Sequence, residues 1–218
     1  MINAAVLQRV DLGTQQLLLY VPEPRLLKDH YQEIKKNNPS AAFPYWAQVW
    51  PAAIGLCQFL LRHVQYLQDK KILELAAGLG LPSLLAAHYA REVLASDHIP
   101  GAVALMRYSV QHNGIKNMQC DLLDWNDLPA TLKADTLLLS DINYAPAVFD
   151  EVYSIIQRFL NDGTTIILST PQRLMAKPFI DRIYPYCILQ EEVLVEKTGQ
   201  PSFITVFVLQ NPAILPAE

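Results

Sequence analysis

Apolar and polar positions alternate in blocks along most of this chain, and the blocks follow a regular order. Short apolar runs of strand length are each followed by a longer segment whose apolar residues recur at helical spacing. Five such runs are predicted strands, near 71–76, 93–97, 117–121, 135–141 and 164–169. The segments between and after them are predicted helices, near 82–90, 100–112, 147–160 and 174–183. This alternation predicts a doubly wound, mostly parallel sheet with helices on both faces.

The pattern changes towards the carboxyl end of the chain. Two β-like runs at 187–195 and 202–209 are separated only by a short turn around Thr198-Gly199-Gln200-Pro201. So short a connection joins antiparallel neighbours, because a parallel pair needs a long crossover. The sequence therefore predicts a seven-stranded Rossmann-like sheet that finishes in an antiparallel hairpin.

The first part of the chain has its own pattern. Residues 4–10 and 15–21 are β-capable runs around a Gly-containing turn, which predicts a hairpin, and a charged stretch from 25 to 36 predicts a short helix. Apolar residues between 54 and 67 recur at helical spacing, and Pro51 suits the first turn of that helix. We expect residues 1–42 to form a small N-terminal extension and residues 43–218 to form the main domain.

Composition narrows the class of protein. The chain has 218 residues, 51% hydrophobic and 17% charged, which suits one α/β domain with a buried sheet. The net charge of −4 and the absence of a dense Lys/Arg tract argue against a nucleic-acid partner. No segment offers the ~20 apolar residues that span a bilayer, and the N-terminus lacks signal-peptide features, so we expect no membrane partner. Three cysteines without metal-ligand spacing predict a reduced, cytoplasmic protein without a bound metal.

The most informative motif is ILELAAGLG at residues 72–80. A strand followed by a Gly-containing turn and a helix is the plan of a site for an adenosine-type cofactor. Gly78 and Gly80 are present, but Ala76 occupies the alternate position before them. The complete GxGxxG motif of dinucleotide-binding sites is therefore absent. Glu74 adds a carboxylate where phosphates would otherwise lie. This favours a cationic ligand, and S-adenosylmethionine is the expected one.

Polar and aromatic residues at the next strand ends extend this site. Asp97 ends a strand about 20 residues beyond the turn, where a ribose-binding acid belongs; its alternative role is to cap the helix near Pro100. Trp125 follows the third strand, where an indole can stack on adenine beside the Asp124 carboxylate. A core tryptophan that covers a loop is the competing interpretation.

A second group of residues is expected on the side of the group being transferred. Asp141 should emerge at the carboxyl end of the fourth, central strand, with Tyr144 three residues later, and capping of the following helix is its alternative role. The loop with Tyr45, Trp46 and Trp50 is strongly aromatic, and aromatic faces attract a sulfonium or ammonium. Tyr45 and Trp46 fit a hydrophobic lid equally well.

Together these segments resemble one known family. The set WPAAIGLCQFL, KILELAAGLGLPSL, LASDHIP, LLDW and SDINY is similar to the seven-β-strand (class I) S-adenosylmethionine-dependent methyltransferases of the methyltransferase-like lysine methyltransferase family, family 16. That family includes enzymes acting on chaperones, translation factors and the β-subunit of electron transfer flavoprotein. The resemblance runs from about Tyr45 to Leu209.

The resemblance implies a role for each candidate residue. The cofactor-binding set would be Trp50, Glu74, Gly78, Gly80, Asp97, Asp124 and Trp125. Within it, the turn would hold the methionine part, Asp97 the ribose, and Asp124 with Trp125 the adenine. Asp141 and Tyr144 match the D-x-x-Y signature of the methyl-acceptor channel and would be the catalytic pair. Arg173 and Phe179 also fit the family pattern without an assigned role, and Ala76 departs from it.

These observations predict an S-adenosylmethionine-dependent methyltransferase that N-methylates a protein side chain, with lysine as the expected acceptor. The amine must lose its proton first, because a lysine has a reference pKa of about 10.4. A dry aromatic channel favours the neutral amine, whereas the Asp141 carboxylate favours the charged one. Two alternatives stay open: methylation of a small amine or metabolite, and a catalytically silent binding protein with this fold.

Overall fold

The computed structural model describes residues 5–197 and 199–214, and its secondary structure follows the predicted order. The strands are β1 (Ala5–Asp11), β2 (Gln16–Pro22), β3 (Lys71–Glu74), β4 (Glu92–Asp97), β5 (Met118–Leu122), β6 (Thr136–Ser140), β7 (Thr165–Pro171), β8 (Cys187–Lys197) and β9 (Gln200–Leu209). The α-helices are α1 (Pro24–Asn37), α2 (Pro51–Arg62), α3 (Leu81–Ala86), α4 (Pro100–His112), α5 (Phe149–Asn161) and α6 (Lys177–Ile183). The short 3-10 turns are η2 (Tyr45–Ala47), η3 (Val64–Tyr66), η4 (Trp125–Asp127), η5 (Pro146–Val148), η6 (Leu174–Ala176) and η7 (Tyr184–Tyr186). Across the described ranges, no helix combines the length and the apolar character that crossing a membrane requires.

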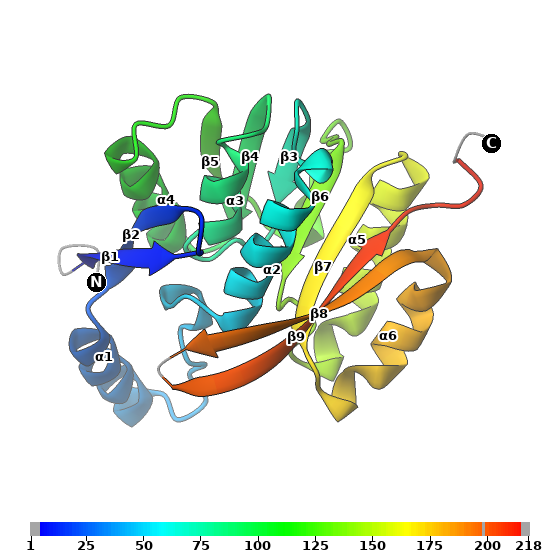
Figure 1. Ribbon diagram of the computed structural model, residues 1–218. Coiled ribbons are helices and arrows are strands. Elements are labelled where there is room, and N and C mark those ends of the chain that lie inside the picture. Colours follow the sequence, from blue (N-terminus) through cyan, green and yellow to red (C-terminus); the bar gives the residue numbers. More distant parts are fainter. Residues whose placement is uncertain (1–4, 198, 215–218) are drawn as a thin grey trace.

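The main sheet confirms the predicted fold class. Its seven strands lie in the order β5-β4-β3-β6-β7-β9-β8. The five strands from β5 to β7 are parallel, whereas β9 runs antiparallel to both β7 and β8. The predicted carboxyl-terminal hairpin is therefore present, although Thr198 of its turn lies outside the described residues, as does Ala4 at the start of the first predicted strand. Figure 1 shows β6 in the middle of this sheet.

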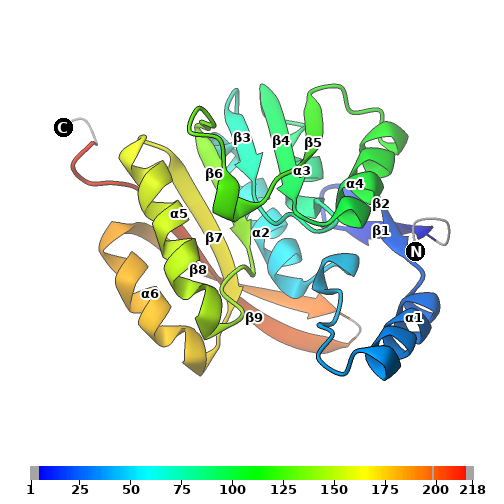
Figure 2. The same cartoon turned by 180° about the vertical axis from the view of Figure 1, so that it is seen from behind.

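Alternating side chains on the central strand divide the core into two layers. Leu138 faces a cluster that includes residues of α2, α3 and α4, whereas Leu137 and Leu139 face a cluster built with α5 and α6. This is the period of two expected for a strand that is buried on both faces. Figures 1 and 2 show α2 and α3 over one face and α5 and α6 over the other.

The observed elements end earlier than predicted where the backbone changes conformation. Strand β3 ends at Glu74 instead of 76, because Ala76 adopts a left-handed conformation with φ of 51°. Helix α3 ends at Ala86 instead of 90, because the His88 and Tyr89 N–H groups bond three residues back, as in a tight 3-10 turn. The helix predicted over 54–67 begins at Pro51 and gives way to η3 after Arg62.

The predicted N-terminal hairpin forms a separate two-stranded sheet of β1 and β2 that packs against the main domain. Gly13 has φ of 87° in its turn, and its N–H donates to Asp11 Oδ1 at 2.8 Å. The hairpin is fastened to α4, because the Tyr20 N–H donates to Ser109 Oγ at 2.9 Å. Leu19 is fully buried in the first core cluster. The division into residues 1–42 and 43–218 stays a prediction, and the hairpin shares the core of the main domain.

Candidate functional site

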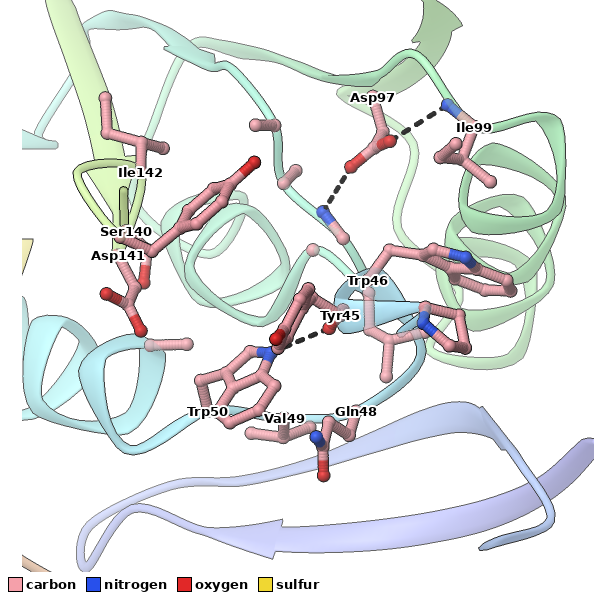
Figure 3. Close-up of a pocket in the computed structure, with 18 of the residues that line it drawn as sticks. Tyr45, Trp46, Gln48, Val49, Trp50, Asp97, Ile99, Ser140, Asp141 and Ile142 are labelled. Atoms are coloured by element: carbon pink, nitrogen blue, oxygen red, sulfur yellow. Dashed lines mark hydrogen bonds between the residues drawn. The ribbon is translucent and has the colours of Figure 1, made fainter. Parts of the chain in front are cut away.

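A cavity of about 670 Å³ opens at the carboxyl ends of β3, β4 and β6. The chain leaves β3 for β4 on one side and later returns to place β6 on the other, so this is the switch point where open α/β sheets bind ligands. Its size lies in the range of small-molecule and cofactor sites. The described residues show no group of three His, Cys, Asp or Glu side chains arranged to hold a metal ion. Figure 3 shows Asp97 on one side of the cavity and Asp141 on the other.

The turn between β3 and α3 forms one wall of the cavity. Ala76, Gly78 and Gly80 all have positive φ, at 51°, 56° and 71°. A side chain is disfavoured at Gly78 for a second reason, because an added Cβ would lie 3.2 Å from the Trp46 carbonyl oxygen. The predicted strand, turn and helix are present, and the alternate left-handed residues give the turn its tight course.

Glu74 contributes a buried carboxyl group to this wall. Its Oε2 accepts hydrogen bonds from the Ser83 N–H at 3.0 Å and the Ser83 hydroxyl at 2.5 Å. Its Oε1 has no hydrogen-bond partner within the described part of the chain. Burial raises the pKa of Glu74 to about 8, against the two Ser83 hydrogen bonds that lower it, and the nearby Asp97 charge raises it further. A ligand with an ammonium or sulfonium would supply the favourable charge that this carboxyl lacks, so the residues present fit a cationic cofactor.

Asp97 ties the end of β4 to the same turn. Its Oδ2 accepts the Gly78 N–H and its Oδ1 accepts the Ile99 N–H, both at 2.9 Å (Figure 3). The N-cap residue of α4 is Ile99. The carboxylate thus sits just before the helix, lines the cavity and is only 4% exposed. Each carboxylate oxygen retains a further lone pair, which leaves capacity for a ribose hydroxyl.

The neighbouring residues Trp125 and Asp124 have different surroundings in the structure. Trp125 lines the cavity and also packs against the second core cluster, so both sequence interpretations of this side chain describe part of its surroundings. Asp124 is not among the cavity-lining residues of the described chain. Its Oδ1 accepts from the Asn126 N–H at 2.9 Å and from the Asn126 side chain at 3.0 Å, which caps η4.

Asp141 stands at the end of β6, on the opposite side of the cavity. It has φ of 55°, a left-handed conformation that Asp tolerates better than most residues. Its N–H still donates to the Ser169 carbonyl of β7 at 2.8 Å. Its carboxylate does not cap η5 or α5, whose N-cap residues are Ala145 and Val148. The sharp turn at Asp141 therefore directs the carboxylate into the cavity.

Arg173 is a site residue for which the sequence alone indicated no role. Its guanidinium holds the Asp141 carboxylate through two hydrogen bonds, Nη1 to Oδ1 at 2.5 Å and Nη2 to Oδ2 at 3.0 Å. Arg173 also lines the cavity. It follows β7, the parallel neighbour of β6, so both side chains leave the sheet at the same edge. The predicted neighbouring strands were therefore the feature of the sequence from which this pair could have been inferred.

The remaining wall near Asp141 is aromatic. We call Tyr45, Trp50 and Tyr144 the aromatic wall; the Tyr45 ring centroid lies 5.8 Å from that of Trp50 and 6.0 Å from that of Tyr144. The Trp50 indole N–H donates to the Tyr45 carbonyl at 2.7 Å (Figure 3). Tyr45 and Tyr144 are about half exposed, at 54% and 48%. Trp46 also lines the cavity, and its ring packs on Gly101, where an added Cβ would lie 3.1 Å from the ring.

Comparisons with known proteins give this geometry a context. A family model described as lysine methyltransferase matches residues 35–184. Human histone-arginine methyltransferase METTL23 is 37% identical over 126 residues, which cover 55% of this chain and 66% of that protein. Bovine protein-lysine methyltransferase METTL21E is 31% identical over 172 residues, or 73% of this chain and 58% of that protein. The predicted family resemblance is confirmed. The chain spans about half to two thirds of the length of the curated relatives that head the comparison.

The fold also matches solved structures. The Thermus thermophilus 16S rRNA N2 G1207 methyltransferase, in complex with AdoMet and guanosine, superposes with a TM-score of 0.61 at 15% identity over 95% of this chain and 50% of that chain. At this identity the likeness shows the fold alone. The expected absence of a nucleic-acid partner gains no support from the comparisons, because that neighbour acts on RNA.

Proposed function

We propose that this chain, which belongs to the lysine methyltransferase family, transfers a methyl group from S-adenosylmethionine to a nitrogen atom of a protein side chain. One observation carries the proposal. A single cavity at the sheet's switch point has a buried carboxyl group and the Gly-containing turn on one side, and a strand-end carboxylate with an aromatic wall on the other. The first half suits a cationic adenosine-type cofactor, and the second suits a nitrogen acceptor.

On the cofactor side, the proposed binding residues surround the turn. Glu74 offers Oε1 to a cationic group, while the left-handed Gly78 and Gly80 give the turn its tight course along the cavity. Asp97 offers its remaining lone pairs to the ribose, and the cavity-facing indole of Trp125 offers a surface for adenine. When bound, S-adenosylmethionine supplies a methyl carbon that is activated by the positive charge on sulfur.

On the acceptor side, the proposed residues position an amine. The aromatic wall offers ring faces against which the aliphatic part of an acceptor side chain can pack, and its Trp50 indole remains the proposed contact to the cofactor. After the amine has lost a proton to solvent, its lone pair forms the new N–C bond while the electrons of the broken C–S bond remain on sulfur. Alignment is the main requirement of such an in-line displacement. In this mechanism Tyr144 and Asp141 orient the nitrogen.

Lysine is the first proposed acceptor, because the matching family is described as lysine methyltransferase. Arginine is the second, because the human relative at 37% identity is named a histone-arginine methyltransferase. We also propose that the N-terminal extension takes part in acceptor choice. Its α1 reaches the mouth of the cavity through a chain of rings, from Tyr31 to Phe43 at 5.2 Å and from Phe43 to Tyr45 at 5.4 Å.

We place this activity in the cytoplasm as part of the proposal. The three cysteines at positions 57, 120 and 187 are free thiols, and two of them are buried in the core. Thiols of this kind are typical of proteins that work in a reducing compartment.

The test has two steps, a binding measurement and a transfer assay. Calorimetric titration with S-adenosylmethionine should give a saturable signal and thermal stabilisation. Labelled methyl groups should then enter proteins of a host lysate, and mass spectrometry of the modified band identifies the residue. Label found only in small molecules contradicts the protein acceptor, and the absence of both binding and stabilisation favours the silent binding protein.

A further inference from the structure

The acceptor half of the cavity contains an ion pair where the D-x-x-Y signature by itself indicates a carboxylate. The Asp141 side chain is 14% exposed and the Arg173 side chain 28% exposed, so the pair is largely withdrawn from water. Both carboxylate oxygens are engaged by the two terminal guanidinium nitrogens. Such a two-point contact fixes the orientation of both groups and brings their charges together.

This pairing changes the field that an incoming amine meets. A carboxylate by itself stabilises an ammonium, the form of a lysine that cannot accept a methyl group. A guanidinium at hydrogen-bond distance cancels most of that attraction, because the pair as a whole carries no net charge. The Tyr45 and Tyr144 rings on the adjacent wall then favour desolvation without adding a negative charge.

We propose that Arg173 is a positioning residue that neutralises Asp141, so that the acceptor site accommodates an uncharged amine instead of holding an ammonium. This inference rests on the proposed function, since it assigns the acceptor half of that same cavity. It explains how a carboxylate can line the channel without trapping the acceptor in its unreactive form. Asp141 can still orient the neutral amine, because each of its oxygens accepts one hydrogen bond from Arg173 and retains a further lone pair.

The proposal is tested by binding of two small probes instead of turnover. The full chain, saturated with S-adenosylhomocysteine, is titrated near neutral pH with n-butylammonium and with 1-pentanol, a neutral probe of similar size, and binding is followed by ligand-observed NMR. In the wild type we expect the ammonium to bind no more tightly than the alcohol. In Arg173→Met, the uncovered carboxylate should raise ammonium affinity about tenfold and leave alcohol affinity within about twofold.

Three further variants separate this effect from a structural one. Arg173→Lys keeps the charge and should behave as the wild type. The double variant Asp141→Asn/Arg173→Met removes both charges and should return ammonium affinity to the wild-type value. Arg182→Met is the matched control, because it removes an arginine that pairs with exposed Asp150 and lies outside the cavity lining. It should leave both affinities unchanged. If Arg173→Met does not fold, Arg173→Gln replaces it.

Several results would overturn the proposal. These are equal ammonium affinity in the wild type and Arg173→Met, a strong preference of the wild type for ammonium, an equal gain in Arg182→Met, or no binding of either probe to any variant. If S-adenosylhomocysteine does not bind, the proposed function fails, and the same titrations on the cofactor-free chain still decide the role of Arg173. With an active enzyme, Arg173→Met should lower kcat without raising KM for the acceptor, whereas a merely structural defect should raise KM.

Discussion

At the scale of single residues, Asp97 and Asp141 occupy similar positions but meet different partners. Asp97 is the last residue of β4 and Asp141 directly follows β6, at the same edge of the sheet. Asp97 accepts two backbone N–H groups, from the turn and from the start of α4, whereas among the described residues the Asp141 carboxylate accepts from the Arg173 side chain alone. Asp97 is therefore part of the architecture of the turn, and Asp141 can be changed with less effect on the fold.

Substitution of the two carboxylates should separate binding from transfer. Asp97→Ala removes a charged acceptor from two partly buried N–H groups, which should lower the free energy of unfolding by about 1–3 kcal/mol and weaken S-adenosylmethionine binding. Asp141→Asn keeps a residue that tolerates the left-handed conformation, so it should bind the cofactor nearly normally and lose turnover. Calorimetry and single-turnover assays on both variants measure this division. Normal cofactor affinity in folded Asp97→Ala would contradict it.

The raised pKa of Glu74 predicts that the stability of the cofactor-free protein depends on pH. Its pKa is raised from 4.5 to about 8 in the fold, so between these values the unfolded chain loses a proton that the folded chain keeps. The free energy of unfolding should therefore fall as pH rises through this window and level off above about 8. Glu74→Gln, which resembles the protonated form, should lack this contribution. Urea titrations from pH 5 to 8 compare the two proteins, and a constant difference between them would contradict the assignment.

At the scale of elements, the turn from 75 to 80 depends on which residues adopt positive φ. Ala76 occupies this conformation with a side chain, at a cost of about 1–2 kcal/mol, and nearby packing of its methyl group offsets part of that cost. Gly78 has the same backbone conformation and also lies against the Trp46 backbone. The turn thus tolerates Ala at one position and is expected to reject it at the other.

The matched pair Gly78→Ala and Ala76→Gly tests this difference. Gly78→Ala should lower the free energy of unfolding by about 1–3 kcal/mol, through left-handed strain and contact with the Trp46 carbonyl. Ala76→Gly should change it by less than about 1 kcal/mol, because relief of strain opposes the loss of a packed methyl group. Thermal and urea unfolding measure both. Equal effects of the two substitutions would show that φ at these positions does not govern stability.

At the scale of the whole molecule, the N-terminal hairpin and the main sheet share one core cluster. Leu19 of β2 is fully buried in it together with residues of α2, α3 and α4, whereas Leu7 of β1 is exposed. A shared core predicts that the hairpin and the main sheet unfold together. This would make the extension a structural part of the protein as well as a contributor to the mouth of the cavity.

Leu19→Ala and Leu7→Ala form the corresponding test. Leu19→Ala should lower the free energy of unfolding of the whole chain by about 2–5 kcal/mol in a single transition. Leu7→Ala should change it by no more than about 0.5 kcal/mol. Urea unfolding followed by both circular dichroism and tryptophan fluorescence measures the transitions. A separate early transition in Leu19→Ala, with the main transition unmoved, would show that the hairpin is an independent unit.

Much of this architecture was predictable because it depends on local patterns. The apolar run Leu137–Leu139 indicated a strand buried on both faces, and Gly78 and Gly80 indicated the turn that follows β3. The position of Asp124 was not predictable in the same way, because whether it faces the cavity or caps η4 depends on a 3-10 turn that no periodicity indicates. The strand order predicted from the sequence brings Arg173 to the same sheet edge as Asp141, but it does not show that the two side chains pair, because they lie 32 positions apart in the chain.

The sequence by itself determined the order of elements, the class of fold and the edge of the sheet at which the cavity opens. These follow from hydrophobic periodicity and from the length of each connection, which act over short stretches of chain. Only the tertiary structure decided that Arg173 covers Asp141, that Glu74 is buried with a raised pKa, and that the hairpin joins the main core. These depend on which side chains meet after distant segments pack, and the energy of a charge is set by such neighbours and by its distance from water.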